Sequence, residues 1–232
     1  MNTDIVFVVP AIKPRIKDES IGTLILAKKA LLSGFNAKIV RWWEAAYSPK
    51  DNYTKFKDEI VRIILSHNPQ IVSFYCRCEE YHICLDLSRV IKQLKNQTVI
   101  IYGGPQSELV AIETISRFPF VDYVCCSEGE NTIIPLLDFV LNNDGSIPIS
   151  SVKGLTYRNN KDIAVQNIFP DFLKDNYCRD YYYYDLIPQE SFNDCDSMPI
   201  DVGRGCPFSC TYCSTKTFWK RKFRLRKIEK YK

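Results

Sequence analysis

Three cysteines near the C-terminus have a spacing that favours an iron–sulfur cluster. Cys206, Cys210 and Cys213 are separated by three and two residues in a loop that begins Gly203-Arg-Gly205. Structural zinc needs a fourth ligand, and the nearest further cysteine, Cys195, lacks a paired spacing. Three thiolates match a four-iron cluster with one iron left open. We therefore predict Cys206, Cys210 and Cys213 as metal ligands, with zinc binding or plain structural thiols as the alternatives.

Five other cysteines occur in or beside apolar runs, and we expect them to be core or near-core thiols, because free cysteine is among the most buried residue types. The N-terminal stretch MNTDIVFVVP has an acidic residue before its apolar run and no basic region, unlike a signal peptide. No stretch approaches the roughly 20 apolar residues that span a bilayer. We expect a cytoplasmic protein without disulfides or membrane contact. The five cysteines are Cys76, Cys78, Cys84, Cys125 and Cys126.

Short apolar runs alternate with amphipathic stretches along residues 1–143. Because parallel strands need helical crossovers, this alternation predicts an α/β fold with a doubly wound, five-stranded parallel sheet of flavodoxin-like or Rossmann-like type. Ligands of such sheets bind outside the carboxyl ends of the strands. We expect strands at 5–9, 37–40, 71–75, 99–102 and 121–125, and helices at 20–34, 53–65, 80–95, 107–117 and 131–141.

The remaining chain is predicted to form two further units. Residues 144–198 are predicted to form a hairpin that turns at Asn159-Asn160, followed by a linker. We expect the linker's run Tyr181–Tyr184 to pack against a neighbouring domain, with a ligand platform as the alternative. Residues 199–232 begin a second domain. From residue 204 onward there are ten Lys and Arg residues against one acid. We interpret this basic end as the start of a larger domain rather than a nucleic-acid patch.

The cysteine loop, with Tyr212 directly before its last cysteine, resembles the signature of the radical S-adenosylmethionine (SAM) superfamily. The resemblance implies that the three cysteines ligate three irons of a 4Fe-4S cluster, that SAM chelates the fourth iron, and that Tyr212 lies near the adenine. It also implies an external one-electron reductant, whose electron cleaves SAM to a 5′-deoxyadenosyl radical. The protein would hold the geometry while the cofactors supply the chemistry.

Two upstream motifs are similar to those of the cobalamin-binding domains in one branch of this superfamily: Gly103-Gly104-Pro105 after the fourth strand and Glu128-Gly129-Glu130 after the fifth. Each motif alone has a plain alternative, a tight turn or helix N-terminal charges. The loop after the first strand lacks the Asp-x-His-x-x-Gly motif, which implies cobalt without a histidine ligand. The resemblance implies cobalamin contacts by Tyr75, Cys76, Arg77, Gly103, Gly104, Pro105, Glu128, Gly129 and Glu130.

The predicted function is that of the N-terminal part of a cobalamin-dependent radical SAM enzyme, a methyltransferase or a catalyst of related radical chemistry on a small molecule. Nineteen residues follow Cys213, whereas a partial barrel needs on the order of 200. We therefore expect the chain alone to be inactive, and name no catalytic residue. The alternatives are a free-standing cobalamin or iron–sulfur module without catalysis, and a tRNA-modifying radical SAM protein. We do not favour the tRNA alternative, because Cys76, Cys78 and Cys84 do not match a second cluster motif.

Overall fold

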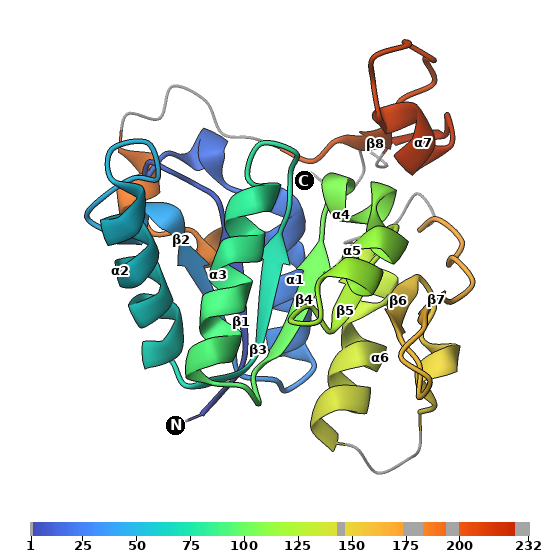
Figure 1. Cartoon of the computed structure of the whole chain (residues 1–232). Coiled ribbons are helices and arrows are strands. Elements are labelled where there is room, and N and C mark those ends of the chain that lie inside the picture. The colour runs from blue at the N-terminus through green and yellow to red at the C-terminus, as the bar shows by residue number, and fades with distance from the viewer. Residues whose placement is uncertain (1, 143–146, 174–182, 194–199, 226–232) are drawn as a thin grey trace.

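The first five strands form a parallel sheet in the order β2-β1-β3-β4-β5. This is the flavodoxin-like order, in which the strand order reverses between β1 and β3. The strands are β1 (Thr3–Val9), β2 (Ala37–Arg41), β3 (Pro69–Tyr75), β4 (Val99–Gly103) and β5 (Tyr123–Cys125). The computed structural model describes residues 2–142, 147–173, 183–193 and 200–225 (Figure 1).

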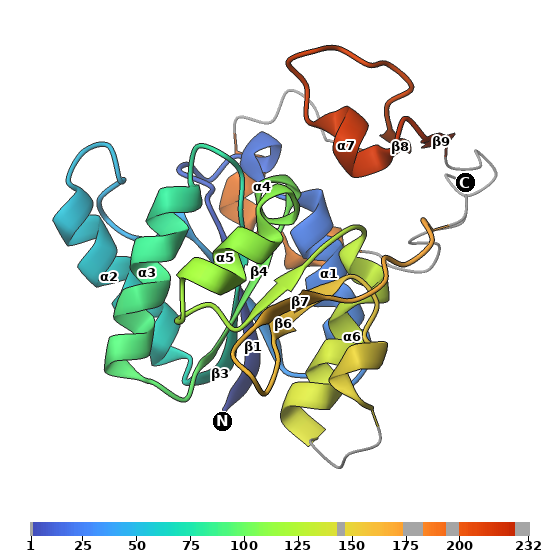
Figure 2. The same cartoon turned by 45° about the vertical axis from the view of Figure 1, so that its right-hand side comes forward.

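The hairpin is not separate from this sheet. Strand β6 (Leu155–Arg158) pairs antiparallel with β5, and β7 (Ala164–Gln166) pairs antiparallel with β6, so the sheet has seven strands (Figure 2). The prediction of a five-stranded, all-parallel sheet was therefore wrong in strand number. The physical reason is that β5 would otherwise leave its backbone donors and acceptors unpaired at an open edge.

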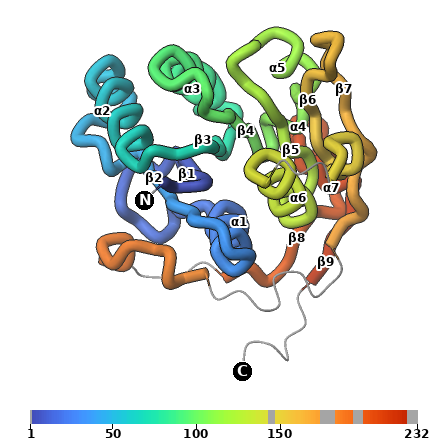
Figure 3. The backbone as a smooth tube through the Cα atoms, turned by 90° about the horizontal axis from the view of Figure 1, so that it is seen from below, coloured from blue at the N-terminus to red at the C-terminus, as the bar shows by residue number. Residues whose placement is uncertain are grey.

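Helices cover both faces of the sheet. Figure 3 shows α2 (Tyr53–Ser66), α3 (Tyr81–Leu94) and α5 (Ala111–Arg117) on one side, and α1 (Ile21–Leu32) and α6 (Ile133–Leu137) on the other. Alternate residues of β1 enter the two cores: Val6 and Val8 pack in the first, Ile5 and Phe7 in the second. This burial on both faces explains why the strand reads as a continuous apolar run.

The expected helices occur, with two departures. Ser20 caps α1, its Oγ accepting a bond from the Thr23 amide at 3.3 Å. The helix expected at 107–117 is broken at Val110 into α4 (Pro105–Leu109) and α5. The helix expected at 131–141 is a succession of a 3-10 turn, α6 and a π-helical turn. The short turns are η1 (Ile16–Asp18), η2 (Trp42–Glu44), η3 (Gly129–Asn131), η4 (Asp138–Asn142), η5 (Ile149–Ser151), η6 (Tyr184–Leu186) and η7 (Gln189–Phe192).

The described part of the linker packs back onto the α/β layers. Tyr183 and Ile187 are buried in a small core with Ile16 and with residues of α1. The predicted packing role of the tyrosine run is thus seen for Tyr183, while Tyr181 and Tyr182 lie outside the described residues. This contact brings the linker beside the loop that follows β1.

The C-terminal segment lies over the carboxyl edge of the sheet. Strands β8 (Gly203–Gly205) and β9 (Phe223–Leu225) pair antiparallel, and helix α7 (Thr215–Trp219) lies between them in sequence (Figure 2). Gly205 has φ +96°, and a Cβ there would lie 1.9 Å from the Lys222 carbonyl oxygen. The hairpin backbone therefore requires this glycine. Within the described ranges, no helix combines the length and apolar character needed to cross a membrane.

Candidate cofactor site

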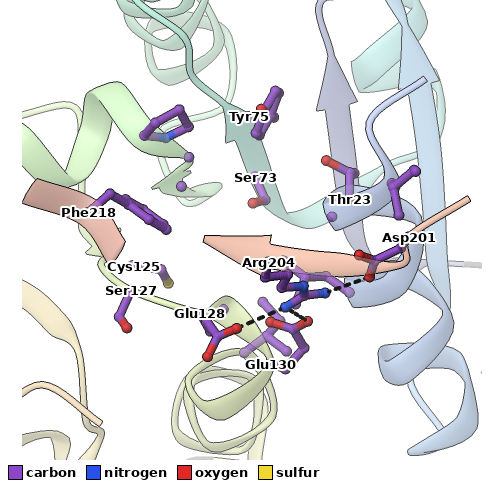
Figure 4. Close-up of a pocket in the computed structure, with 18 of the residues that line it drawn as sticks. Thr23, Ser73, Tyr75, Cys125, Ser127, Glu128, Glu130, Asp201, Arg204 and Phe218 are labelled. Atoms are coloured by element: carbon purple, nitrogen blue, oxygen red, sulfur yellow. Dashed lines mark hydrogen bonds and ion pairs between the residues drawn. The ribbon is translucent and has the colours of Figure 1, made fainter. Parts of the chain in front are cut away.

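A cavity of about 560 Å³ opens at the carboxyl edge, between the sheet and the C-terminal segment. The ends of β3, β4 and β5 supply Ser73, Tyr75, Gly103 and Cys125, and the loop after β5 supplies residues 127–130. The opposite wall consists of residues 200–204 and part of α7 (Figure 4). The cavity therefore lies where a doubly wound sheet is expected to bind its ligand, and the cysteine-bearing segment encloses it.

The two glycines after β4 have different roles. Gly104 has φ +99°, and a Cβ there would lie 2.7 Å from the backbone oxygen of Cys76. A Cβ on Gly103 would meet no atom within 4 Å. Gly104 is thus required by the turn itself, whereas Gly103 keeps space open in the cavity. Its open backbone fits the approach of a flat corrin ring, and Pro105 lines the cavity beside it.

The structure separates the three residues predicted at the end of β3. Tyr75 lines the cavity, and burial raises the pKa of its phenol. Cys76 is fully buried in the first core, where its thiol lies 3.7 Å from the Phe74 carbonyl oxygen. Arg77 pairs with Glu80 at 2.6 Å and borders a separate cavity next to the loop after β1. Of the three, only Tyr75 faces the candidate cobalamin site.

The Glu128-Gly129-Glu130 motif lines the cavity, but its carboxylates bind arginines. Glu128 Oε1 lies 3.1 Å from Arg204 Nη1, and Glu130 Oε1 lies 2.6 Å from the same nitrogen (Figure 4). Ser127, directly before the motif, adopts φ 67°, and its amide donates to Glu108. This left-handed residue turns the chain sharply between β5 and the motif. Both carboxylates are therefore engaged with the C-terminal segment.

The three cysteines of the loop are free thiols on the segment that joins β8 to α7. Cys210 is exposed, and Cys206 and Cys213 are half-buried. Hydrogen bonds from the side chain and the backbone of Thr215 lower the pKa of Cys213, which favours the thiolate form that binds metal. Across the described residues, no three His, Cys, Asp or Glu side chains are arranged to hold a single metal ion.

That finding gives no support to tetrahedral zinc, while Cys195 lies outside the described residues. An iron–sulfur cluster is a larger body than one ion, so its thiolates need not converge on one point. Donor type and loop spacing thus fit a cluster. Tyr212 is 90% exposed and does not line the cavity, and its place near adenine stays a prediction.

Within the described ranges, the cysteines outside the loop mostly lie in the core, as predicted. Cys76, Cys84 and Cys126 are buried, and Cys125 is half-buried at the cavity. The prediction was wrong for Cys78, which is exposed in the turn after β3. Because Cys76 and Cys84 face the interior and Cys78 faces solvent, these three do not form a second exposed cluster motif.

Sequence reasoning missed two arginines of this site. Arg204 and Arg224 were counted only as part of a basic C-terminal segment, yet both contact Glu128. The signal was a charge imbalance: the segment is strongly basic and the rest of the chain acidic. Composition alone could not show that two of the cations lie against one buried carboxylate.

Sequence comparisons find distant relatives. No family profile matches the chain. An uncharacterized methyltransferase of Pyrococcus horikoshii is 26% identical over 74% of this chain and 37% of its own length. The anaerobic magnesium-protoporphyrin IX monomethyl ester cyclase of Synechocystis is 24% identical over 91% of the chain and 42% of its own. The chain therefore spans less than half of these curated relatives.

Structural comparisons cover nearly the whole chain. The cobalamin-dependent SAM radical enzyme OxsB, solved with aqua-cobalamin bound, has a TM-score of 0.76 at 16% identity, over 99% of this chain and 30% of its own. The radical SAM methyltransferase TsrM of Kitasatospora setae, solved with cobalamin and a [4Fe-4S] cluster, has a TM-score of 0.69 at 14% identity, over 99% and 45%. The resemblance predicted from the cysteine loop and the upstream motifs is confirmed.

Proposed function

We propose that this chain is the N-terminal part of a cobalamin-dependent radical SAM enzyme that catalyses methyl transfer or related radical chemistry. The observation that carries the proposal is the placement of the cavity. One wall is the carboxyl edge of a flavodoxin-like sheet with an open glycine, and the other is the segment that bears three cysteines. A site for cobalamin and a loop for a cluster thus adjoin in one fold.

In this proposal, Gly103, Pro105 and Tyr75 bind the corrin, and Cys206, Cys210 and Cys213 hold the cluster. When bound, cobalamin, the 4Fe-4S cluster and SAM supply the methyl group and the radical chemistry. The sheet edge and the C-terminal segment supply the two walls of the cavity. Neither His67 nor His82 lines the cavity, which supports cobalamin without a protein histidine on cobalt.

A small-molecule substrate, an external one-electron donor and dependence on further polypeptide belong to the same proposal. The chain spans 30% of the length of OxsB and 45% of the length of TsrM. These fractions are consistent with a part of a larger enzyme. Several apolar side chains of the C-terminal segment are exposed, as expected for a surface that further structure covers. They are Phe208, Tyr212, Phe223 and Leu225.

The cluster assignment is tested by anaerobic reconstitution of the full chain with iron and sulfide. We expect about four irons per chain, measured with the visible absorption of the cluster. Cys210→Ala should abolish this gain, while Cys78→Ala, which removes an exposed thiol outside the loop, should retain it. Equal iron content in the two variants would overturn the assignment.

The cobalamin site is tested by titrating the chain with hydroxocobalamin and following its absorption spectrum. We expect saturable binding with a spectrum that lacks the signature of histidine ligation. A chain that leaves the hydroxocobalamin spectrum unchanged, and from which the corrin separates on gel filtration, would exclude the proposed site.

A further inference from the structure

One buried carboxylate connects the loop after β5 to both strands of the C-terminal hairpin. Glu128 Oε1 accepts hydrogen bonds from Arg204 Nη1 at 3.1 Å and from Arg224 Nη2 at 2.9 Å. Its Oε2 accepts from Arg224 Nη1 at 2.9 Å and from the Leu173 amide at 2.6 Å. The Glu128 side chain is 1% exposed. Each carboxylate oxygen of Glu128 therefore accepts two hydrogen bonds from within the protein.

Arg204 is held by acids on two sides. It contacts Glu128 and Glu130 from the sheet side, and Asp201, 3.5 Å away, from its own segment (Figure 4). Arg204 lies on β8, two residues before Cys206. Its position therefore sets where the cysteine loop begins.

Arg224 on β9 is held by aromatic rings as well as by Glu128. Its guanidinium carbon lies 5.1 Å from the ring centre of Phe172 and 5.3 Å from that of Trp219, within the range of cation–π attraction. It also donates to the Leu173 carbonyl oxygen. Trp219 ends α7, the helix that follows the last cysteine of the loop. Both ends of the loop are thus fixed near Glu128.

We propose that Glu128, with Arg204 and Arg224, forms a joint that positions the cysteine loop at the cavity. Glu128 is a positioning residue in this view: it acts through the two arginines and not on a reacting group. The part of this inference that concerns cobalamin and the cluster rests on the proposed function. The part that concerns how Glu128 holds residues 200–225 rests on the ion pairs with Arg204 and Arg224.

The ion pairs of the joint fix the orientation of the C-terminal segment more than they add net stability. Buried ions lose hydration, so an ion pair contributes little net stability unless its geometry is good. The fork of Arg224 meets both oxygens of Glu128, and such bidentate contact fixes distance and angle together. Removal of the carboxylate leaves the guanidinium groups of Arg204 and Arg224, whose side chains are only 13% and 11% exposed, without this partner. The position of residues 200–225 against the sheet then becomes less favourable than a position away from it.

The joint is tested first in the full chain without added cofactors, by hydrogen exchange of the amides in β8 and β9. Glu128→Gln should raise their exchange rates on the order of a hundredfold, as expected when a buried ion pair loses one charge. Arg224→Met should act similarly, and the double variant should be no worse than the stronger single one. Glu80→Gln is the matched control, because Glu80 is a buried carboxylate at the same sheet edge that pairs with Arg77 instead.

Unchanged exchange in Glu128→Gln, or additive effects in the double variant, would overturn the joint. The second readout is the spectrum and affinity of hydroxocobalamin, which we expect to weaken at least tenfold in Glu128→Gln with the fold of residues 2–142 intact. If exchange rises while affinity and spectrum stay at their original values, the positioning role is refuted. If the unaltered chain binds no cobalamin, the proposed function fails, and the exchange data still decide the joint.

Discussion

Arg41 donates a hydrogen bond from Nε to Oε1 of Glu19 at 2.6 Å, and the two side chains are only 4% and 2% exposed. Arg41 ends β2, and Glu19 ends the loop that follows β1. The arginine also donates from Nη2 to the Leu186 carbonyl oxygen at 2.9 Å. One buried cation therefore ties together a sheet edge, a carboxyl-edge loop and the linker.

Glu19→Gln should lower the free energy of unfolding by about 3 kcal/mol, because it leaves the buried Arg41 charge uncompensated. Asp162→Asn is the control. Asp162 is 91% exposed, lies 3.8 Å from Arg158, and should contribute less than about 1 kcal/mol. Urea unfolding at pH 7 measures both variants. Equal losses in the two would mean that the Arg41 pair is no stronger than a surface one.

The two glycines after β4 allow a sharper test of the cavity. Gly104→Val should destabilise the fold by about 2 kcal/mol or more, because its φ is positive and the new side chain would meet the Cys76 backbone. Gly103→Val should keep the fold, since open space surrounds its Cβ position. It should instead weaken hydroxocobalamin binding by filling the cavity. Thermal unfolding and absorption titration separate the two effects.

A Gly103→Val variant that is unfolded, or one that binds hydroxocobalamin as tightly as the unaltered chain, would contradict this division of roles. The same pair shows what sequence can and cannot resolve. The Gly-Gly-Pro motif indicates a tight turn at a ligand edge. The motif does not show which glycine is required by the turn and which leaves space for the ligand. That division depends on how close each Cβ position lies to the backbone of Cys76, in another loop.

The parallel strands and most helices were predictable because their signals are local: apolar runs, amphipathic spacing and caps such as Ser20. The attachment of the hairpin to β5 was not, since strand pairing is a nonlocal contact between residues such as Val124 and Thr156. The same holds in the site. The cysteine spacing is local and was read directly, whereas the partnership of Glu128 with Arg224 spans 96 residues.

Asp86 should make stability depend on pH in the acid range. Burial raises its pKa, but hydrogen bonds from Tyr53, Arg89 and Lys57 outweigh burial and lower the pKa to about 2. Because the folded pKa lies below the unfolded value of about 3.9, this contribution is present above pH 4 and is lost as pH falls toward 2. Asp86→Asn should reduce the difference in urea midpoint between pH 6 and pH 3.

The control for this pH dependence is Asp162→Asn, which alters a carboxylate that is almost fully exposed and should leave the difference between the two midpoints unchanged. A midpoint difference that is identical in the unaltered chain and in Asp86→Asn would show that the hydrogen bonds to Asp86 do not stabilise its charged form.

Thiol reactivity should separate the cysteines by burial. Burial raises the pKa of Cys126 to about 11, so at pH 8 almost none of this thiol is the reactive thiolate, and the fold also blocks access to it. Cys78 is exposed in the turn after β3. With iodoacetamide at pH 8, we expect Cys78 to be alkylated within minutes and Cys126 only after unfolding in urea, as peptide mass spectrometry would show. Cys78→Ser should remove alkylation at that position without altering the protection of Cys126. Alkylation of Cys126 as fast as Cys78 in the native protein would mean that the sheet opens readily between β5 and β6.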